Sequence, residues 1–273
     1  MTFSIVARSD DGDSWGVSVA SKFLAVGCAV PAARVDVGAV ATQSYVNTLY
    51  KRDGLAHLGQ GRSAQETLDA LIAVDDGRDE RQAGVVDAGG SAATFTGTGC
   101  LDWAGGTTGN GFACQGNILV GSAVVDAMVA TWIRHGDLAF AERLVAALAA
   151  GDAEGGDSRG RQSAALLVVS RTGSYTPGDD LAYDLRVDDH PDPVGELSRL
   201  LTLHHGYFDE PDPDTLLPLE GEVAAEVERL LERVGRPDLD TWAGVENYEA
   251  RLRPGSIDPY VLDRLREQAA ATR

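Results

Sequence analysis

The sequence is poor in lysine, although it is rich in charge. Among its 23 basic residues only Lys22 and Lys51 are lysines, whereas acidic residues number 42, so the formal net charge is −19. A chain without a basic stripe cannot neutralise phosphates and release their counterions, so we expect no nucleic-acid partner. An anionic membrane surface is expected to repel the chain for the same reason.

Long apolar runs and paired cysteines are also missing. No run approaches the ~20 residues that a helix needs to cross a bilayer, so we expect no membrane association. Cys28, Cys100 and Cys114 are odd in number and widely spaced, which fits neither a disulfide framework nor a metal-ligand set. We therefore expect reduced thiols, no metal and no cofactor. The N-terminal segment MTFSIVARSDDG lacks the basic and apolar regions of a signal peptide, so the expected location is cytoplasmic.

Familiar catalytic motifs are absent as well. The chain has no P-loop, no strand-linked GxGxxG, no HExxH, no CxxC pair and no GxSxG elbow. Its five histidines are scattered along the sequence. A Ser-His-Asp triad therefore has no local support.

What the sequence does contain is a series of short alternating segments. Segments 2–8 and 15–21 flank an acidic turn and predict a hairpin. Further strands are predicted within 28–43, 81–97, 163–171 and 181–189. Ser63 and Glu66 form a capping box that opens a helix over 63–74, and two more helices are predicted at 122–135 and 137–150. Runs of strands, then helices, then strands predict an α+β fold with helices on antiparallel sheets.

The character of the chain changes from Pro191 onward. Helical periodicity marks residues 193–206 and again 221–234, and a Pro/Asp-rich stretch separates them. We therefore predict a first domain over residues 1–207, a linker over 208–220 and a small helical module over 221–273.

Thr2 is the residue that suggests a chemistry. Removal of Met1, which aminopeptidases catalyse before a small residue, would leave Thr2 at the start of a strand with a free α-amine. The reference pKa of that amine, about 7.7–8.0, lets it accept the hydroxyl proton near neutral pH. A threonine activated by its own amine is a recognised nucleophile. Position 2 alone carries little weight, because many unrelated chains begin with Met-Thr.

The surrounding segments add a resemblance. TFSIVARS, a turn and WGVSVASKF resemble the first hairpin of N-terminal-nucleophile (Ntn) hydrolases, which include proteasome β-subunits. In order, MTFSIVAR, GVSVASKFLAVG, GAVATQ, QGNIL and GGDSRGRQSAALLVV resemble the family known as domain of unknown function 1028 (DUF1028), regarded as Ntn-hydrolase-like. The resemblance covers residues 1–210 and implies a four-layer αββα sandwich.

Lys22 and the QGN element are candidate partners of Thr2. A Lys22 ammonium beside the α-amine would disfavour protonation of that amine; otherwise Lys22 is a solvated turn residue. In the QGN element, Gln115, Gly116 and Asn117, the glycine permits close backbone approach and the Asn117 amide offers donors to an oxyanion. The alternative is a Gly-Asn turn that caps local backbone.

The loop GGDSRGRQS supplies candidate substrate-binding residues. They are Asp157, Arg159, Arg161 and Gln162. An arginine here could bind a substrate carboxylate with two hydrogen bonds, or an Asp–Arg pair could merely stiffen the loop. Gln43, together with Ser21 and Ser44, lies at a strand end and could face the same cleft.

The sequence thus predicts an amide hydrolase that acts through an acyl-Thr2 intermediate on a small-molecule amide or peptide-like substrate. Open sheet edges and superfamily habit favour a homo-oligomer. The alternative is a catalytically silent Ntn-fold binding or assembly protein, with cell-wall fragments as one candidate ligand. Residues 239–267 resemble a peptidoglycan-binding-type extension, in which Trp242 and Tyr248 would contact a ligand or fill the core.

Overall fold

The computed structural model describes residues 2–173 and 178–272. The chain forms two compact units, Met1–Arg199 and Leu200–Arg273. The division falls inside helix α6 (Pro193–Phe208), so the segment 208–220 that we expected to be a linker belongs to the second unit.

The first unit contains a six-stranded sheet in which every neighbouring pair is antiparallel. Its strand order is β10-β9-β2-β1-β8-β7. The strands are β1 (Thr2–Arg8), β2 (Ser14–Ser21), β7 (Gly105–Gly109), β8 (Phe112–Asn117), β9 (Ser163–Ser170) and β10 (Leu181–Val187). The strand that begins at Thr2 therefore lies in the middle of this sheet.

A second, four-stranded antiparallel sheet has the order β3-β4-β5-β6. Its strands are β3 (Pro31–Arg34), β4 (Gly38–Ser44), β5 (Arg81–Asp87) and β6 (Ala92–Thr96). The two sheets face each other, with β1 against β4 and β5 and with β8 against β5. Side chains such as Val6, Val17, Ala41 and Val86 fill the space between them.

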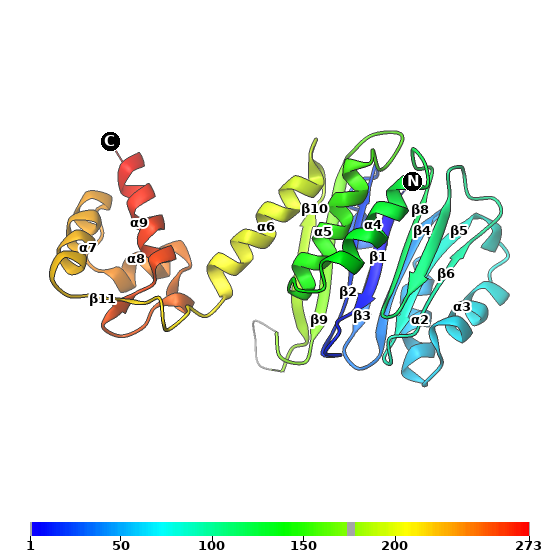
Figure 1. Ribbon diagram of the computed structural model, residues 1–273, viewed down its shortest axis with the longest axis horizontal. Helices are drawn as coiled ribbons and strands as arrows, with labels where there is room; N and C mark the ends of the chain where they lie inside the picture. Colours follow the sequence, from blue (N-terminus) through cyan, green and yellow to red (C-terminus); the bar gives the residue numbers. More distant parts are fainter. Residues whose placement is uncertain (1, 174–177, 273) are drawn as a thin grey trace. The chain divides into compact units, whose positions relative to one another are not determined.

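Helices cover the sheets on their other faces (Figure 1). Helices α4 (Ala123–Arg134) and α5 (Phe140–Ala153) pack on the six-stranded sheet, and α2 (Leu49–Gly59) and α3 (Ala64–Ala73) pack on the four-stranded one. A short helix, α1 (Val26–Ala29), lies between β2 and β3 in the chain, and a 3-10 turn, η1 (Arg78–Glu80), precedes β5. The capping box of α3 is present, because Ser63 Oγ accepts from Glu66 N and Glu66 Oε2 accepts from Ser63 N.

The α+β fold with antiparallel sheets is confirmed, and two segments differ from expectation. The Gly-rich stretch after residue 105 contains the β7–β8 hairpin, so the QGN element ends a strand rather than forming a turn. Helix α2 was not predicted, because its glycines weaken the helical pattern. Gly54 has a packing reason there: a Cβ at this position would lie 3.1 Å from Val40 Cγ2 on β4.

The second unit is built from α7 (Gly221–Val234), α8 (Leu239–Glu246) and α9 (Pro259–Ala271), with a 3-10 turn η2 (Glu249–Arg251). A two-stranded sheet joins β11 (Leu217–Pro218) to β12 (Ser256–Ile257). The rings of Trp242 and Tyr248 stack with centroids 5.6 Å apart, and both are buried. These two aromatic residues are therefore core side chains of the unit.

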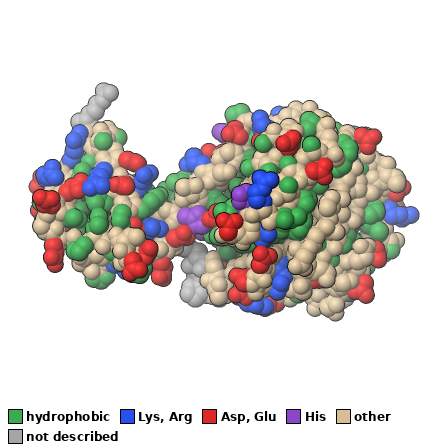
Figure 2. Space-filling view, viewed as in Figure 1, with side chains coloured by type: hydrophobic (Ala, Val, Ile, Leu, Met, Phe, Trp, Pro, Cys, Tyr) green, Lys and Arg blue, Asp and Glu red, His purple; other side chains and the backbone are tan. Residues whose placement is uncertain are grey.

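The acidic, moderately apolar composition is reflected in the surface and in the helices. On the face shown in Figure 2, acidic side chains are spread over the surface with basic ones among them. Within the described residues, no helix combines the length and apolarity needed to cross a membrane.

Candidate functional site

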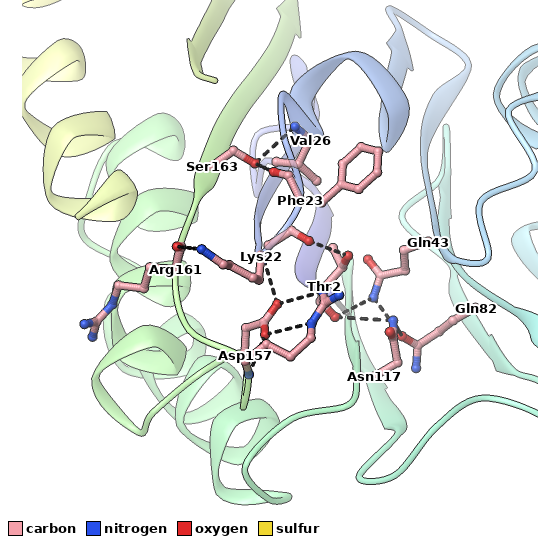
Figure 3. A network of polar contacts seen from close by, with 12 residues as sticks. Thr2, Lys22, Phe23, Val26, Gln43, Gln82, Asn117, Asp157, Arg161 and Ser163 are labelled. Atoms are coloured by element: carbon pink, nitrogen blue, oxygen red, sulfur yellow. Dashed lines mark hydrogen bonds and ion pairs between the residues drawn. The ribbon is translucent and has the colours of Figure 1, made fainter. Parts of the chain in front are cut away.

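Thr2 is the first residue of β1 and lies between the two sheets. Its side chain shares one face of β1 with Ser4 and Val6, because alternate residues of a strand point the same way. The Thr2 hydroxyl lies 3.0 Å from the Ser21 hydroxyl at the end of β2, and the Thr2 residue is only 5% exposed. Figure 3 shows Thr2 with the polar groups around it.

A cluster of buried side-chain amides lies beside Thr2. Gln43 on β4 donates from Nε2 to the Thr2 carbonyl at 3.2 Å and to Gln82 Oε1 at 2.7 Å. Ser4 donates to Gln43 Oε1 at 2.7 Å and accepts from Gln115 Nε2 at 2.7 Å. All of these side chains are fully buried, so the region between the sheets is polar at the Thr2 end and apolar farther along.

Asn117 completes this cluster from the end of β8, directly opposite Thr2 in the strand register. Its Nδ2 donates to Gln82 Oε1 at 2.8 Å and to the Thr2 carbonyl at 3.4 Å. These two acceptors fix which end of the amide is nitrogen. The Oδ1 atom is buried and has no hydrogen-bond partner in the described part of the chain. A buried acceptor without a donor is costly, which marks this atom as available to a ligand or to a new donor.

Gln82 is a member of the cluster that the sequence analysis missed. It donates from Nε2 to the carbonyl of Gly116 at 2.7 Å and to Thr96 Oγ1 at 2.9 Å. The one signal in the sequence is a glutamine near the start of the otherwise apolar strand RQAGVVD. Gly84, on the same strand, makes room for the cluster, because a Cβ there would lie 2.2 Å from Gln115 Oε1.

Gly116 makes room for a side chain just beyond the end of β8. A Cβ at this position would lie 2.4 Å from Leu119 Cδ1, so the missing side chain accommodates Leu119. Its carbonyl accepts from Gln82.

Lys22 contacts the site through its backbone. Its amide nitrogen donates to Asp157 Oδ2 at 2.6 Å, whereas its Nζ donates to the carbonyl of Arg161 at 3.2 Å. Figure 3 shows the side chain extending away from Thr2. The structure therefore does not place this ammonium beside the Thr2 amine.

The four predicted loop residues take part in three separate pairings. Asp157 is buried and accepts from the backbone of Lys22, and it forms an ion pair with Arg159 at 3.3 Å. Arg161 pairs instead with Asp152 at 2.8 Å, and the hydrogen bond that Arg161 donates to the Asp152 carboxylate raises the pKa of Arg161. Gln162 donates to Asp189 Oδ1 at 3.1 Å. Only the Asp157–Arg159 pair thus belongs to the surroundings of Thr2.

Residues with strained backbone lie near the end of the sheets at which Thr2 is found. Ala25, Ser44 and Ile118 have positive φ angles of 53°, 70° and 51°. Ser44 is the last residue of β4, whereas Ala25 and Ile118 follow β2 and β8. They are three of the five non-glycine residues with positive φ in the described ranges. Such a conformation is a genuine outlier for a β-branched residue like Ile118, and outliers of this kind cluster at functional sites.

The described residues offer no cluster of metal ligands. Across residues 2–173 and 178–272, no three or more His, Cys, Asp or Glu side chains gather closely enough to hold an ion. The polar groups around Thr2 are amides, hydroxyls and one Asp–Arg pair, which suit hydrogen bonding to an organic ligand.

Comparisons with known proteins agree on one family. A model described as a family of unknown function, DUF1028, matches residues 2–197. A crystal structure of a DUF1028 protein from Silicibacter pomeroyi is similar to this chain, with 29% sequence identity and a TM-score of 0.67. The match covers 82% of this chain and 92% of that one. No curated protein matches the sequence. The chain belongs to the DUF1028 family.

Proposed function

We propose that the protein hydrolyses an amide bond in a small, peptide-like molecule through an acyl-Thr2 intermediate. The observation that carries the proposal is the position of the Thr2 hydroxyl. It lies at the start of a central strand, 3.0 Å from Ser21 Oγ and beside a buried amide cluster. An otherwise weak nucleophile is held in one geometry there, which is the condition for attack on a carbonyl.

The reaction needs only groups of this chain and water. After Met1 is removed, the α-amine of Thr2 takes the hydroxyl proton while Oγ bonds to the substrate carbonyl carbon. The tetrahedral intermediate then expels the amine product, which leaves with the proton from the Thr2 ammonium. Water then attacks the carbonyl carbon of the resulting ester while the α-amine takes a proton from the water. The bond between Oγ and the acyl carbon breaks, the carboxylic acid leaves, and the amine returns the proton to Oγ.

Asn117 has a specific place in this scheme. Both acceptors of its Nδ2 belong to the protein, so donation to a substrate oxyanion requires loss of the 3.4 Å contact with the Thr2 carbonyl. Its buried Oδ1 needs a donor, and the Thr2 α-amine formed on Met1 removal is a new donor on the opposite residue of the ladder. We assign Asn117 Oδ1 the role of orienting that amine.

The fold supports the proposal. Two facing sheets with helices on both outer sides fit the four-layer αββα sandwich of Ntn hydrolases. In this architecture a nucleophile at the start of a central strand reaches the end of the sandwich. We also propose, from superfamily habit, a cytoplasmic homo-oligomer.

Arg159 is the candidate for contact with a charged substrate group. Its side chain is 46% exposed, although it pairs with the buried Asp157. A guanidinium in this position can hold a carboxylate of the substrate through two parallel hydrogen bonds.

A second candidate function is that of a silent Ntn-fold binding protein. The position of Lys22 favours it, because its ammonium contacts the Arg161 carbonyl and not the Thr2 end of β1. A silent protein would keep the fold but would have no cation beside the Thr2 amine to disfavour its protonation.

An amide-library screen separates the two. Wild-type protein and the Thr2→Ala variant are compared on every substrate, with Thr108→Ala on the exposed strand β7 as the matched control. We expect Thr2→Ala to lower kcat by about three orders of magnitude or more. The control should retain full activity. Turnover that survives in Thr2→Ala would contradict the proposal.

A further inference from the structure

Large apolar side chains are exposed at the end of the first unit where Thr2 lies. Six of them, each between 51% and 59% exposed, are carried at this end by loops and by the first residue of α2. They are Phe23, Leu24, Tyr45, Leu49, Leu101 and Val120, and we name them the apolar rim. A group of exposed apolar side chains in one region marks a binding surface, whereas single exposed apolar residues are ordinary.

The sheet order places the rim around Thr2. Strand β1 lies between β2 and β8, so the loops that leave these two strands flank its first residue. Phe23 and Leu24 follow β2, and Val120 follows β8. Figure 3 shows the Phe23 ring on the same side of Thr2 as Gln43.

The remaining members lie across from β1 and beyond β8. Tyr45 follows β4, whose Gln43 donates to the Thr2 carbonyl, and Leu49 begins α2. The carbonyl of Leu101 accepts from Ile118 N at 2.9 Å, one residue after Asn117. The rim therefore surrounds Thr2 on three sides.

Hydrogen bonds hold these loops in place. Ser163 Oγ donates to the carbonyl of Phe23, and Arg81 Nη1 donates to the carbonyl of Tyr45 at 2.8 Å. Val120 N donates to the carbonyl of Gly156 at 3.2 Å. The rim side chains are thus presented by fixed backbone, which lowers the entropy cost of binding a ligand.

We infer that the apolar rim binds the acyl group of the substrate, and that this acyl group is a large apolar one. The inference rests on the proposed function. Thr2 is 5% exposed and enclosed by the two sheets, so an acyl group bonded to its Oγ must extend outward past the rim. Burial of apolar surface against these side chains favours a long alkyl or aromatic acyl group.

The layout of the rim favours a small molecule over a protein surface. Its members belong to separate loops that also carry the exposed polar residues Lys22 and Asp102. A ligand that reaches from the loop after β2 to the loop after β8 must cross the position of Thr2, because β1 lies between these two strands. A second copy of the chain seated there would instead cover the nucleophile.

The test uses β-lactones that carry alkyl substituents of increasing length, on protein whose mass shows that Met1 is absent. Thr2 Oγ bonds to the lactone carbonyl carbon, the ring C–O bond breaks, and the released alkoxide takes the hydroxyl proton by way of the amine. The rate of labelling is read from the mass of the N-terminal peptide. We expect the octyl probe to label about tenfold faster or more than the ethyl probe, because buried methylenes stabilise its complex.

Variants locate the effect. Phe23→Ala and Tyr45→Ala should each reduce the octyl-to-ethyl rate ratio by about threefold or more. Ile133→Ala is the matched control, because Ile133 is 65% exposed on α4, outside the rim, and this variant should leave the ratio unchanged. Circular dichroism checks that each variant is folded.

Two results would overturn the inference, and a third would overturn the proposed function on which it rests. Labelling at equal rates for all chain lengths removes the rim from substrate binding and leaves the nucleophile intact. Rim variants that keep the ratio but convert an oligomer into monomers show an interface between copies. No labelling of Thr2 by any lactone would count against the proposed function itself.

Discussion

The hydroxyl oxygens of Thr2 and Ser21 lie 3.0 Å apart where β1 begins and β2 ends. Either oxygen can donate in this pair, so Ser21 can orient the Thr2 hydroxyl and pass on its proton. Ser21→Ala removes this contact without adding bulk, and we expect turnover to fall about 10- to 100-fold. Steady-state kinetics on any substrate from the screen checks this.

The melting temperature serves as the control for Ser21→Ala. It should change little, because the backbone pairing of Ser21 with Ser163 does not depend on the hydroxyl. Unchanged turnover in a folded Ser21→Ala variant would show that the contact plays no part in the reaction.

The proposed contact between Asn117 Oδ1 and the Thr2 amine predicts a pKa change. Asn117→Asp places a carboxylate opposite the amine, which favours the ammonium form and raises the pKa of the amine by about one unit or more. Less free amine then remains at neutral pH, so the acidic limb of kcat/KM moves to higher pH. Asn117→Ala removes the proposed acceptor for the ammonium and should therefore lower the pKa of the amine.

This amine can be titrated without a substrate. The pH dependence of N-terminal acetylation by acetic anhydride reports its pKa directly. Asn110→Asp, at an exposed position between β7 and β8, is the control for an added charge. None of these substitutions replaces a residue of the neighbouring Asp157–Arg159 ion pair. An amine pKa that is identical in Asn117→Asp and wild type would refute the assigned contact.

Gly84 gives a prediction for stability. An added methyl would lie 2.2 Å from Gln115 Oε1 inside the buried cluster, so Gly84→Ala should cost about 1–3 kcal/mol. Urea unfolding measures this loss. Gly121→Ala is the control, because nothing lies within 4 Å of a Cβ at that position. Equal midpoints for the two variants would show that the cluster tolerates displacement of Gln115.

The lowered pKa of Asp75 predicts how acid affects the stability of the fold around the loop that carries Tyr45. Burial acts to raise the pKa of Asp75, but hydrogen bonds from Arg81 and Asn47 outweigh it and hold the pKa well below its usual 3.8. A carboxyl with a lowered folded-state pKa stabilises the fold above about pH 4, and this contribution disappears as the pH falls through the folded-state value.

Asp75→Asn tests this linkage. The variant should melt a few degrees below wild type at pH 7, and the gap should narrow as the pH is lowered below 4. Thermal melts across this range measure the gap. A difference that stays constant with pH would mean that the charge of Asp75 is not responsible.

Much of the fold could be predicted because its signals are local. Alternation in segments 2–8 and 15–21 predicted β1 and β2, and the Ser63–Glu66 capping box predicted the start of α3. The β7–β8 hairpin was missed because GGTTGNG offers glycines and threonines instead of a clear apolar alternation. The strand character of β7 comes from pairing with β8, which pairs in turn with β1, and this is a tertiary effect.

The site was less predictable because its contacts join distant segments. Thr2 and Asn117 could be proposed one by one, but the Gln82 amide that holds Asn117 Nδ2 lies on the other sheet. The direction of the Lys22 side chain depends on the carbonyl of Arg161, which the sequence cannot place. Spatial partners of this kind follow only from the packing of the two sheets.

The mass of the N-terminus decides whether the Thr2 amine is free to act as the base. Protein produced with an active methionine aminopeptidase is purified, and its intact mass and N-terminal peptide are determined by mass spectrometry. The account predicts a chain that begins at Thr2 with a free α-amine. A purified protein that retains Met1 would contradict it, because the Thr2 nitrogen would then be locked in a peptide bond and could not act as the base.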